Sequence, residues 1–188
     1  MAHSDAPFFR GLQLDLNADF FSLFELPRAF RLNEPELDSR FRDVQARVHP
    51  DRFASAPESE RRLSLQWATQ ANEAYQTLKR PLARARYLLE LNGHAIQAEN
   101  NTAMPADFLI EQMEWREAVM EARAGGDHHE LERLYHRLRA DLAGRYEEVG
   151  RLLDDDRDFA QAADRVCRLM FLEKLLADID DALAALEE

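Results

Sequence analysis

Cysteine is almost absent from the sequence, since Cys167 is the only one in 188 residues. A single thiol excludes an internal disulfide, so nothing in the chain points to an oxidising compartment. No stretch approaches the roughly 18 consecutive apolar residues of a membrane span, and the first residues lack the apolar core of a secretory signal. These absences predict a cytoplasmic protein.

Glycine is also scarce, with six residues, and β-branched side chains are few. Leu, Ala, Glu, Asp and Arg dominate instead, and most of these residues favour helices over strands. The hydrophobic fraction of 46% is sufficient for a packed core. The composition therefore predicts an all-α fold.

Positive charge is in short supply in the second half of the chain. Residues 105–188 carry 11 Lys and Arg against 22 Asp and Glu, whereas residues 1–104 carry 13 against 14. Nucleic-acid affinity depends on cationic side chains that neutralise phosphates, so this distribution argues against nucleic-acid binding. A strongly acidic second half suits a partner with a basic surface.

Two helical patterns open the first half. The stretch 19–26 is short and very apolar, and it predicts a short helix packed against something larger. Asn33 and Glu36 have the spacing of a capping box, which predicts the start of a second helix. Pro50 ends this helix, because a proline forces the preceding residue out of the helical region. The apolar stripe of the second helix is Leu37, Phe41, Val44 and Val48.

Two more helices are predicted before the middle of the chain. Ser55 and Glu58 repeat the capping-box spacing with Pro57 in the first turn, which predicts a third helix that ends near Lys79. A fourth, short pattern spans 81–91, and the following Asn-Gly pair is a good helix stop.

The second half contains three longer patterns after a polar stretch without periodicity. Apolar residues recur at three- and four-residue steps, as far as Leu186 in the last pattern. Short connections between long helices predict antiparallel neighbours, hence a three-helix bundle, with Cys167 as a small core residue. The predicted helices span 105–123, 127–153 and 156–186. The predicted parts of the chain are an extension at 1–17, a first domain at 18–93, a linker at 94–104 and the bundle at 105–188.

The tripeptide His49-Pro50-Asp51 lies between the second and third predicted helices. Pro50 has a fixed φ and confines His49 to an extended conformation, so the turn is stiff. The spacing predicts that His49 and Asp51 point into solvent, and polar side chains on a stiff exposed loop suit recognition of a partner.

The tripeptide and its surroundings resemble the HscB family of J-domain co-chaperones. The resemblance runs from Asp19 onward and is carried by FFSLFELP, LDSRFRDVQARVHPDRF, NEAYQTLKRPLARARYLLEL, FLIEQMEWREAVME and FLEKL. It implies an N-terminal J-domain, a helical hairpin with the His-Pro-Asp loop, followed by a C-terminal three-helix bundle in an L-shaped arrangement.

The resemblance also implies a function. HscB-type proteins are non-enzymatic co-chaperones that stimulate the ATPase of a DnaK-type (HscA-like) chaperone and deliver an IscU-type iron–sulfur scaffold protein to it, which promotes cluster maturation and transfer. No cofactor is implied. Arg52 stands where the family usually has lysine, a change that keeps the charge but alters the donor geometry. The residues expected to contact the chaperone are His49, Pro50, Asp51, Arg52, Arg40 and Arg47.

The predicted helix 105–123 has apolar residues on two sides. Its core face on a helical wheel consists of Phe108, Gln112, Trp115, Val119 and Ala122. A second apolar group lies roughly opposite, beside three glutamates, and this combination indicates a protein-binding surface unless the rest of the molecule covers it. The resemblance places the scaffold on the same surface. The residues expected to bind the scaffold are Leu109, Ile110, Met113, Glu114, Glu117, Glu121 and Phe171, with Met113 in place of a leucine common in the family.

Other chemistry finds little support in the sequence. His129, Glu132 and His136 have the spacing of one helix face, but there is no HExxH motif, so we expect surface polar residues and no metal site. The aspartates at 154–158 lack the spacing and the glycine of an EF-hand loop. Two alternatives to the leading assignment remain open: a J-domain adaptor for a different client protein, and a helical metalloenzyme that uses His129 and His136.

Overall fold

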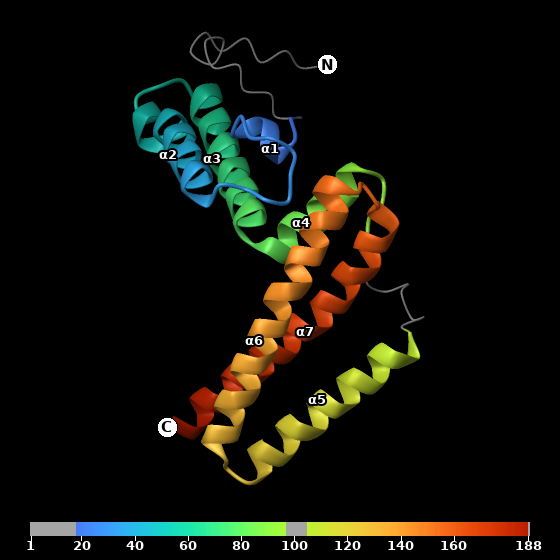
Figure 1. Cartoon of the computed structure of the whole chain (residues 1–188). Helices are drawn as coiled ribbons and strands as arrows, with labels where there is room; N and C mark the ends of the chain where they lie inside the picture. The colour runs from blue at the N-terminus through green and yellow to red at the C-terminus, as the bar shows by residue number, and fades with distance from the viewer. Residues whose placement is uncertain (1–17, 97–104, 188) are drawn as a thin grey trace. The chain divides into compact units, whose positions relative to one another are not determined.

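A computed structural model of the chain describes residues 18–96 and 105–187 (Figure 1). Within these ranges there is no strand, and the all-α prediction is confirmed. The helices described there include none that is both long and apolar enough to cross a membrane. The elements are α1 (Phe20–Leu23), α2 (Glu34–Val48), a 3₁₀ turn (Pro50–Phe53), α3 (Glu58–Lys79), α4 (Pro81–Leu91), α5 (Ala106–Ala124), α6 (His128–Gly150), a π-helical turn (Arg151–Asp155) and α7 (Phe159–Glu187).

Contacts along the chain define two compact units, one ending at Arg84 and the other beginning at Ala85. This division falls inside α4, whereas the division expected from the sequence follows the end of that helix. The Ala85, Leu88 and Leu89 side chains, which give α4 its buried face, belong to the second unit. The predicted extension at 1–17 and most of the predicted linker lie outside the described residues.

The first unit is built on a hairpin of α2 and α3, with α1 packed on α3 (Figure 1). The side chain of Asn33 caps α2 as predicted, because its Oδ1 accepts a hydrogen bond of 3.3 Å from the N–H of Glu36. The predicted apolar stripe supplies Leu37, Val44 and Val48 to the core. The core of this unit also contains Phe21, Leu23, Phe24, Leu26, Phe30, Phe53, Trp67, Ala71, Ala74 and Leu78.

A polar clamp joins α2 to α3 at the edge of this core. The carboxylate of Asp38 accepts hydrogen bonds from Lys79 Nζ at 3.0 Å and from the Tyr75 hydroxyl at 2.9 Å. The Tyr75 ring stacks on Phe41, with 4.1 Å between the ring centroids. The hydrogen bond from Lys79, followed by that from Tyr75, lowers the pKa of the Asp38 carboxyl below the ordinary value of an aspartate.

The prediction of a second capping box was wrong. Helix α3 begins at Glu58, after Pro57, and no side chain caps its first turn. Pro57 is in an extended conformation, with φ −53° and ψ 152°, so it ends the preceding loop and is not part of the helix. Ser55 is therefore too far from the first free N–H groups of α3 to accept a hydrogen bond from them.

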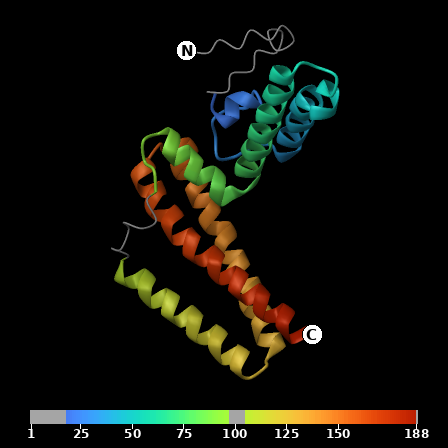
Figure 2. The same cartoon turned by 180° about the vertical axis from the view of Figure 1, so that it is seen from behind.

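The second unit contains the predicted three-helix bundle. Helices α6 and α7 run antiparallel, and α5 lies along the pair (Figures 1 and 2). Cys167 is buried in α7, as expected of a small core residue. The larger side chains of the core are Phe108, Trp115, Leu131, Leu134, Leu138, Leu142, Val149, Leu169, Leu172, Leu175 and Ile179.

Turn chemistry sets the limits of the bundle helices. Gly126 has φ +63°, a left-handed conformation that suits glycine, and Asp127 then caps α6 by accepting a hydrogen bond from the N–H of Glu130. Arg157 also has a positive φ, of 56°, which breaks the helix before α7. Helix α7 therefore begins at Phe159 and not at the predicted position 156. At its other end Leu186 is 41% exposed, so the apolar repeat leaves the core there.

Replacement of Asp38 by asparagine is expected to destabilise the first unit, because an amide attracts the Lys79 ammonium less than a carboxylate does. The pKa of Asp38 is lower in the folded protein than in the unfolded chain. Its contribution to stability is therefore complete above the ordinary pKa of aspartate and disappears as the pH falls through the lower, folded value. The difference in unfolding free energy between wild type and Asp38→Asn should shrink over that acidic range.

Urea unfolding followed by the fluorescence of Trp67 measures this difference in the first unit. Trp115 lies in the second unit, so all three proteins compared (wild type, Asp38→Asn and the control variant) should carry Trp115→Phe. Asp43→Asn on the exposed side of α2 is the matched control and should unfold like the wild type. Equal pH profiles for Asp38→Asn and Asp43→Asn would show that the clamp contributes nothing.

Candidate functional sites

The loop between α2 and α3 has the conformation that its proline requires. His49 ends α2 with φ −58° and ψ 128°, which is the extended conformation expected before a proline. Pro50 to Phe53 then form a single 3₁₀ turn, in which the N–H of Arg52 donates to the carbonyl of His49 at 3.1 Å. The loop is thus a short, internally bonded turn.

Buried groups beneath the loop hold it in place. Ser64, fully buried in α3, donates a hydrogen bond of 2.7 Å to the carbonyl of Val48, one of the unpaired carbonyls at the end of α2. Phe53 is 3% exposed and anchors the far end of the turn in the core. The guanidinium of Arg52 donates to the carbonyl of Ala46 at 2.7 Å. No spacing or motif in the sequence indicates either of the hydrogen bonds made by Ser64 and Arg52.

The two polar side chains of the loop point into solvent, as predicted. The side chain of His49 is 50% exposed and that of Asp51 is 91% exposed. The N–H of Asp51 donates to Nδ1 of His49 at 3.3 Å. Because Nδ1 acts as the acceptor, the neutral ring carries its hydrogen on Nε2. The loop therefore offers one ring N–H donor and one carboxylate acceptor to a partner.

The two arginines expected to extend this surface along α2 differ in their surroundings. Arg40 forms ion pairs with Glu25 at 2.9 Å and with Glu36 at 3.8 Å, and it is half-buried. Arg47 is exposed and makes no ion pair or hydrogen bond to any described residue. Arg47 can thus contact a partner without losing an intramolecular ion pair or hydrogen bond, whereas Arg40 would first have to break its ion pairs.

Helix α5 exposes a second apolar surface, as its two-sided pattern predicts. Its core side is buried, with Phe108 1% and Trp115 8% exposed. On the other side, Ile110 is 57% and Met113 69% exposed, although apolar side chains of this size are usually buried. We call the following group the α5–α7 patch: Leu109, Ile110, Met113, Glu114, Glu117 and Glu121 of α5 with Phe171 of α7, all of them exposed.

Aromatic packing fixes the base of the α5–α7 patch. Phe171 is 42% exposed, and its ring meets the edge of buried Phe108 with 6.4 Å between the centroids. The guanidinium of Arg168 lies 5.4 Å from the Phe108 ring centre, and that of Arg137 lies 4.2 Å from the Trp115 ring centre. These contacts are within the range of cation–π attraction and hold α5 against its neighbours. Phe171 is therefore a supported side chain that projects part of its ring into solvent.

The histidines of α6 form a group that differs from the candidate metal-binding set considered in the sequence. His128, His129 and Glu132 bring their ligand atoms within 4.8 Å of one another, and His136 is not part of this group. Nδ1 of His128 lies 3.8 Å from the Glu132 carboxylate, and Nδ1 of His129 lies 3.5 Å from it. The side chain of His129 is 93% exposed. The three side chains thus lie together at the solvated start of α6.

Comparisons with known proteins extend over both units. A family model described as the HSCB C-terminal oligomerisation domain matches residues 104–180. A co-chaperone protein HscB homolog from Aromatoleum aromaticum is 54% identical over 176 residues, which cover 94% of this chain and 99% of that protein.

Solved structures give the same result. Chaperone HscB from Vibrio cholerae has a TM-score of 0.81 at 36% identity and covers 90% of this chain and 99% of its own. The human co-chaperone protein HscB has a TM-score of 0.83 at 30% identity, with coverages of 89% and 83%. Since these similarities include the loop of the first unit and the bundle of the second, the chain belongs to the HscB family of co-chaperones.

Proposed function

We propose that this protein stimulates the ATPase of a DnaK-type (HscA-like) chaperone and delivers an IscU-type iron–sulfur scaffold protein to it, which promotes cluster maturation and transfer. Membership of the HscB family supports a co-chaperone role. The observation that carries the proposal is that two exposed recognition surfaces lie on two separate units: the His49–Asp51 loop on the first and the α5–α7 patch on the second.

The loop of the first unit is the contact for the chaperone in this proposal. Nε2–H of His49 and the carboxylate of Asp51 supply a donor and an acceptor on a turn that proline keeps stiff, so little conformational entropy is lost on binding. Arg47 and Arg52 add positive charge beside the loop. One N–H of the Arg52 guanidinium donates to the carbonyl of Ala46, and this hydrogen bond fixes the direction of the guanidinium.

The α5–α7 patch of the second unit is the contact for the scaffold. Leu109, Met113 and Phe171 are the apolar anchors, and anchors of this kind contribute most of the affinity of an interface when they are fully desolvated. The glutamates beside them complement basic side chains on the partner, which raises the rate of encounter and excludes partners of the wrong charge.

The two contacts cooperate because one chain carries both. Binding the scaffold to the second unit raises its effective concentration at a chaperone held by the first unit. Hydrolysis of ATP, which the chaperone performs, then traps the scaffold on the chaperone. The described residues of this chain need only bind and orient the two partners, so the proposed role is that of an adaptor without catalysis of its own.

Replacement of His49 by glutamine tests the chaperone contact. Stability should change by less than about 0.5 kcal/mol, because an exposed loop residue contributes little to the core. Stimulation of the chaperone ATPase should be lost, since glutamine does not reproduce the ring N–H of the loop. The measurement is the steady-state ATPase rate of the cognate chaperone, with His136→Gln on exposed α6 as the control. Full stimulation by His49→Gln would contradict the role of the loop.

Removal of the apolar anchors tests the scaffold contact. The triple variant Leu109→Ala, Met113→Ala and Phe171→Ala should bind the scaffold at least about a hundredfold more weakly, because each hot-spot truncation costs on the order of 1–2 kcal/mol. Its circular dichroism should match that of the wild type, since the three side chains are exposed.

Calorimetric titration with the cognate scaffold measures this loss. Leu65→Ala is the matched control, because Leu65 is 55% exposed but lies on α3 in the first unit. If the triple variant binds the scaffold as tightly as the control does, the client is a different protein or uses a different surface.

A further inference from the structure

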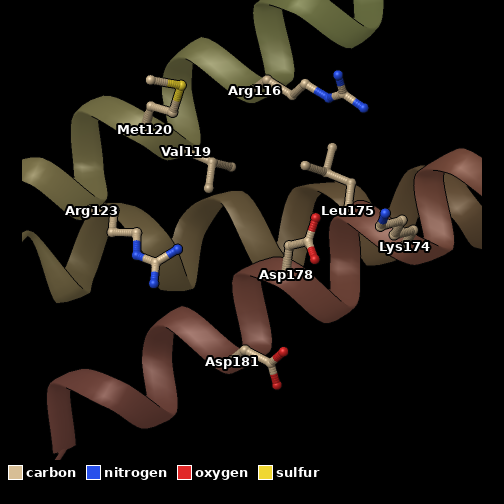
Figure 3. A pocket seen from close by; sticks show the side chains of 8 residues that line it. All are labelled: Arg116, Val119, Met120, Arg123, Lys174, Leu175, Asp178 and Asp181. Atoms are coloured by element: carbon tan, nitrogen blue, oxygen red, sulfur yellow. The ribbon is translucent and has the colours of Figure 1, made fainter.

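A groove runs between α5 and α7 next to the α5–α7 patch (Figure 3). Its volume is about 500 Å³. Val119 on α5 and Leu175 on α7 both point into the space between the two helices, as Figure 3 shows, and Met120 adds an apolar side chain that is 70% exposed. The remaining lining residues are charged: Arg116, Arg123, Lys174, Asp178 and Asp181.

The cations of this groove have no ion-pair partner, unlike several other cations of the bundle. Arg145 pairs with Asp141 at 2.8 Å and Arg165 pairs with Glu148 at 2.9 Å, as expected where acids outnumber bases two to one. Arg116, Arg123 and Lys174 make no ion pair or hydrogen bond to any residue in the described part of the chain. Three cations without an ion pair therefore line one groove, together with two aspartates, in a bundle that has an excess of carboxylates.

The groove is continuous with the patch along two elements. At 100° per residue, Arg116, Met120 and Arg123 continue the stripe of Leu109 and Met113 toward the C-terminal end of α5. On α7, a small cavity lined by Phe171, Leu175 and Lys174 joins the patch to the groove. A partner seated on the patch would thus extend over the groove without crossing any other element.

We propose that the groove, whose lining has three cations and two aspartates, is a second part of the scaffold-binding surface, and that it receives a segment of the scaffold in which an acidic side chain accompanies an apolar one. The apolar side chain contacts Met120 and Val119, and the carboxylate pairs with Arg116. This inference rests on the proposed function. Since the glutamates of the patch and the arginines of the groove have opposite charge, the partner fits in one orientation only, which is how complementary charges fix register.

Charge reversal at Arg116 tests the groove in the full-length chain. Arg116→Glu should weaken binding of the cognate scaffold about tenfold, because it replaces an attraction to a carboxylate by a repulsion. Arg139→Glu is the matched control, since Arg139 is exposed on α6 and also has no ion pair or hydrogen bond within residues 18–96 and 105–187. It changes the net charge equally and should alter the affinity less than about twofold.

The outcomes separate this inference from the proposed function. Equal affinities of Arg116→Glu and Arg139→Glu, with binding still lost in the triple patch variant, would overturn the groove and leave the scaffold contact intact. Binding that survives the triple patch variant would overturn both. Recovery of affinity for Arg116→Glu when one acidic residue of the scaffold is replaced by lysine would support the groove.

Sedimentation measures the oligomeric state of the same variants. If Arg116→Glu changes only the self-association of this chain, the occupant of the groove is a second copy and the inference is wrong.

Discussion

A helix in a three-helix bundle buries one side, and in α5 that side is taken by Phe108, Trp115 and Val119. The remaining circumference has to face solvent whatever residues it carries. Leu109, Ile110 and Met113 are therefore exposed by geometry, because the core has no room for them. The patch, the groove beside it and the proposed binding of the scaffold all depend on this constraint.

The recognition groups of the first unit lie on a loop and not on a helix face. The side chains of an exposed loop have defined positions only if buried residues anchor the loop. Here the proline limits the backbone, Phe53 anchors the turn, and buried Ser64 satisfies a carbonyl at the end of α2. His49 and Asp51 can thus be exposed and still have defined positions. Buried residues therefore make the loop rigid, whereas its exposed residues supply the hydrogen-bonding groups for a partner.

Periodicity and capping were sufficient to predict the helices, the bundle and the exposed side of α5, because each depends on residues three to seven positions apart. Predictions that depend on backbone conformation at single positions were less accurate. Pro57 ended a loop where the spacing of Ser55 and Glu58 suggested a capping box, and the positive φ of Arg157 delayed the start of α7.

Contacts between elements left no signal in the sequence. Nothing in the spacing of Arg116 and Arg123 shows that they lack partners, since this depends on which faces of α7 lie opposite them. The same holds for the pairing of Ser64 with Val48. The identity of the loop residues came from the resemblance to a family, and the residues that support the loop came only from the structure.

The burial of Cys167 has a consequence for a protein proposed to work beside iron–sulfur clusters. Thiolates are strong ligands for iron, and an accessible thiol near a labile cluster could compete for its metal or be oxidised by reactions that the cluster promotes. The only sulfhydryl of this chain lies in the interior of the bundle, 5% exposed. The molecule can thus hold a cluster carrier closely without offering a sulfhydryl that would remove or damage what the carrier holds.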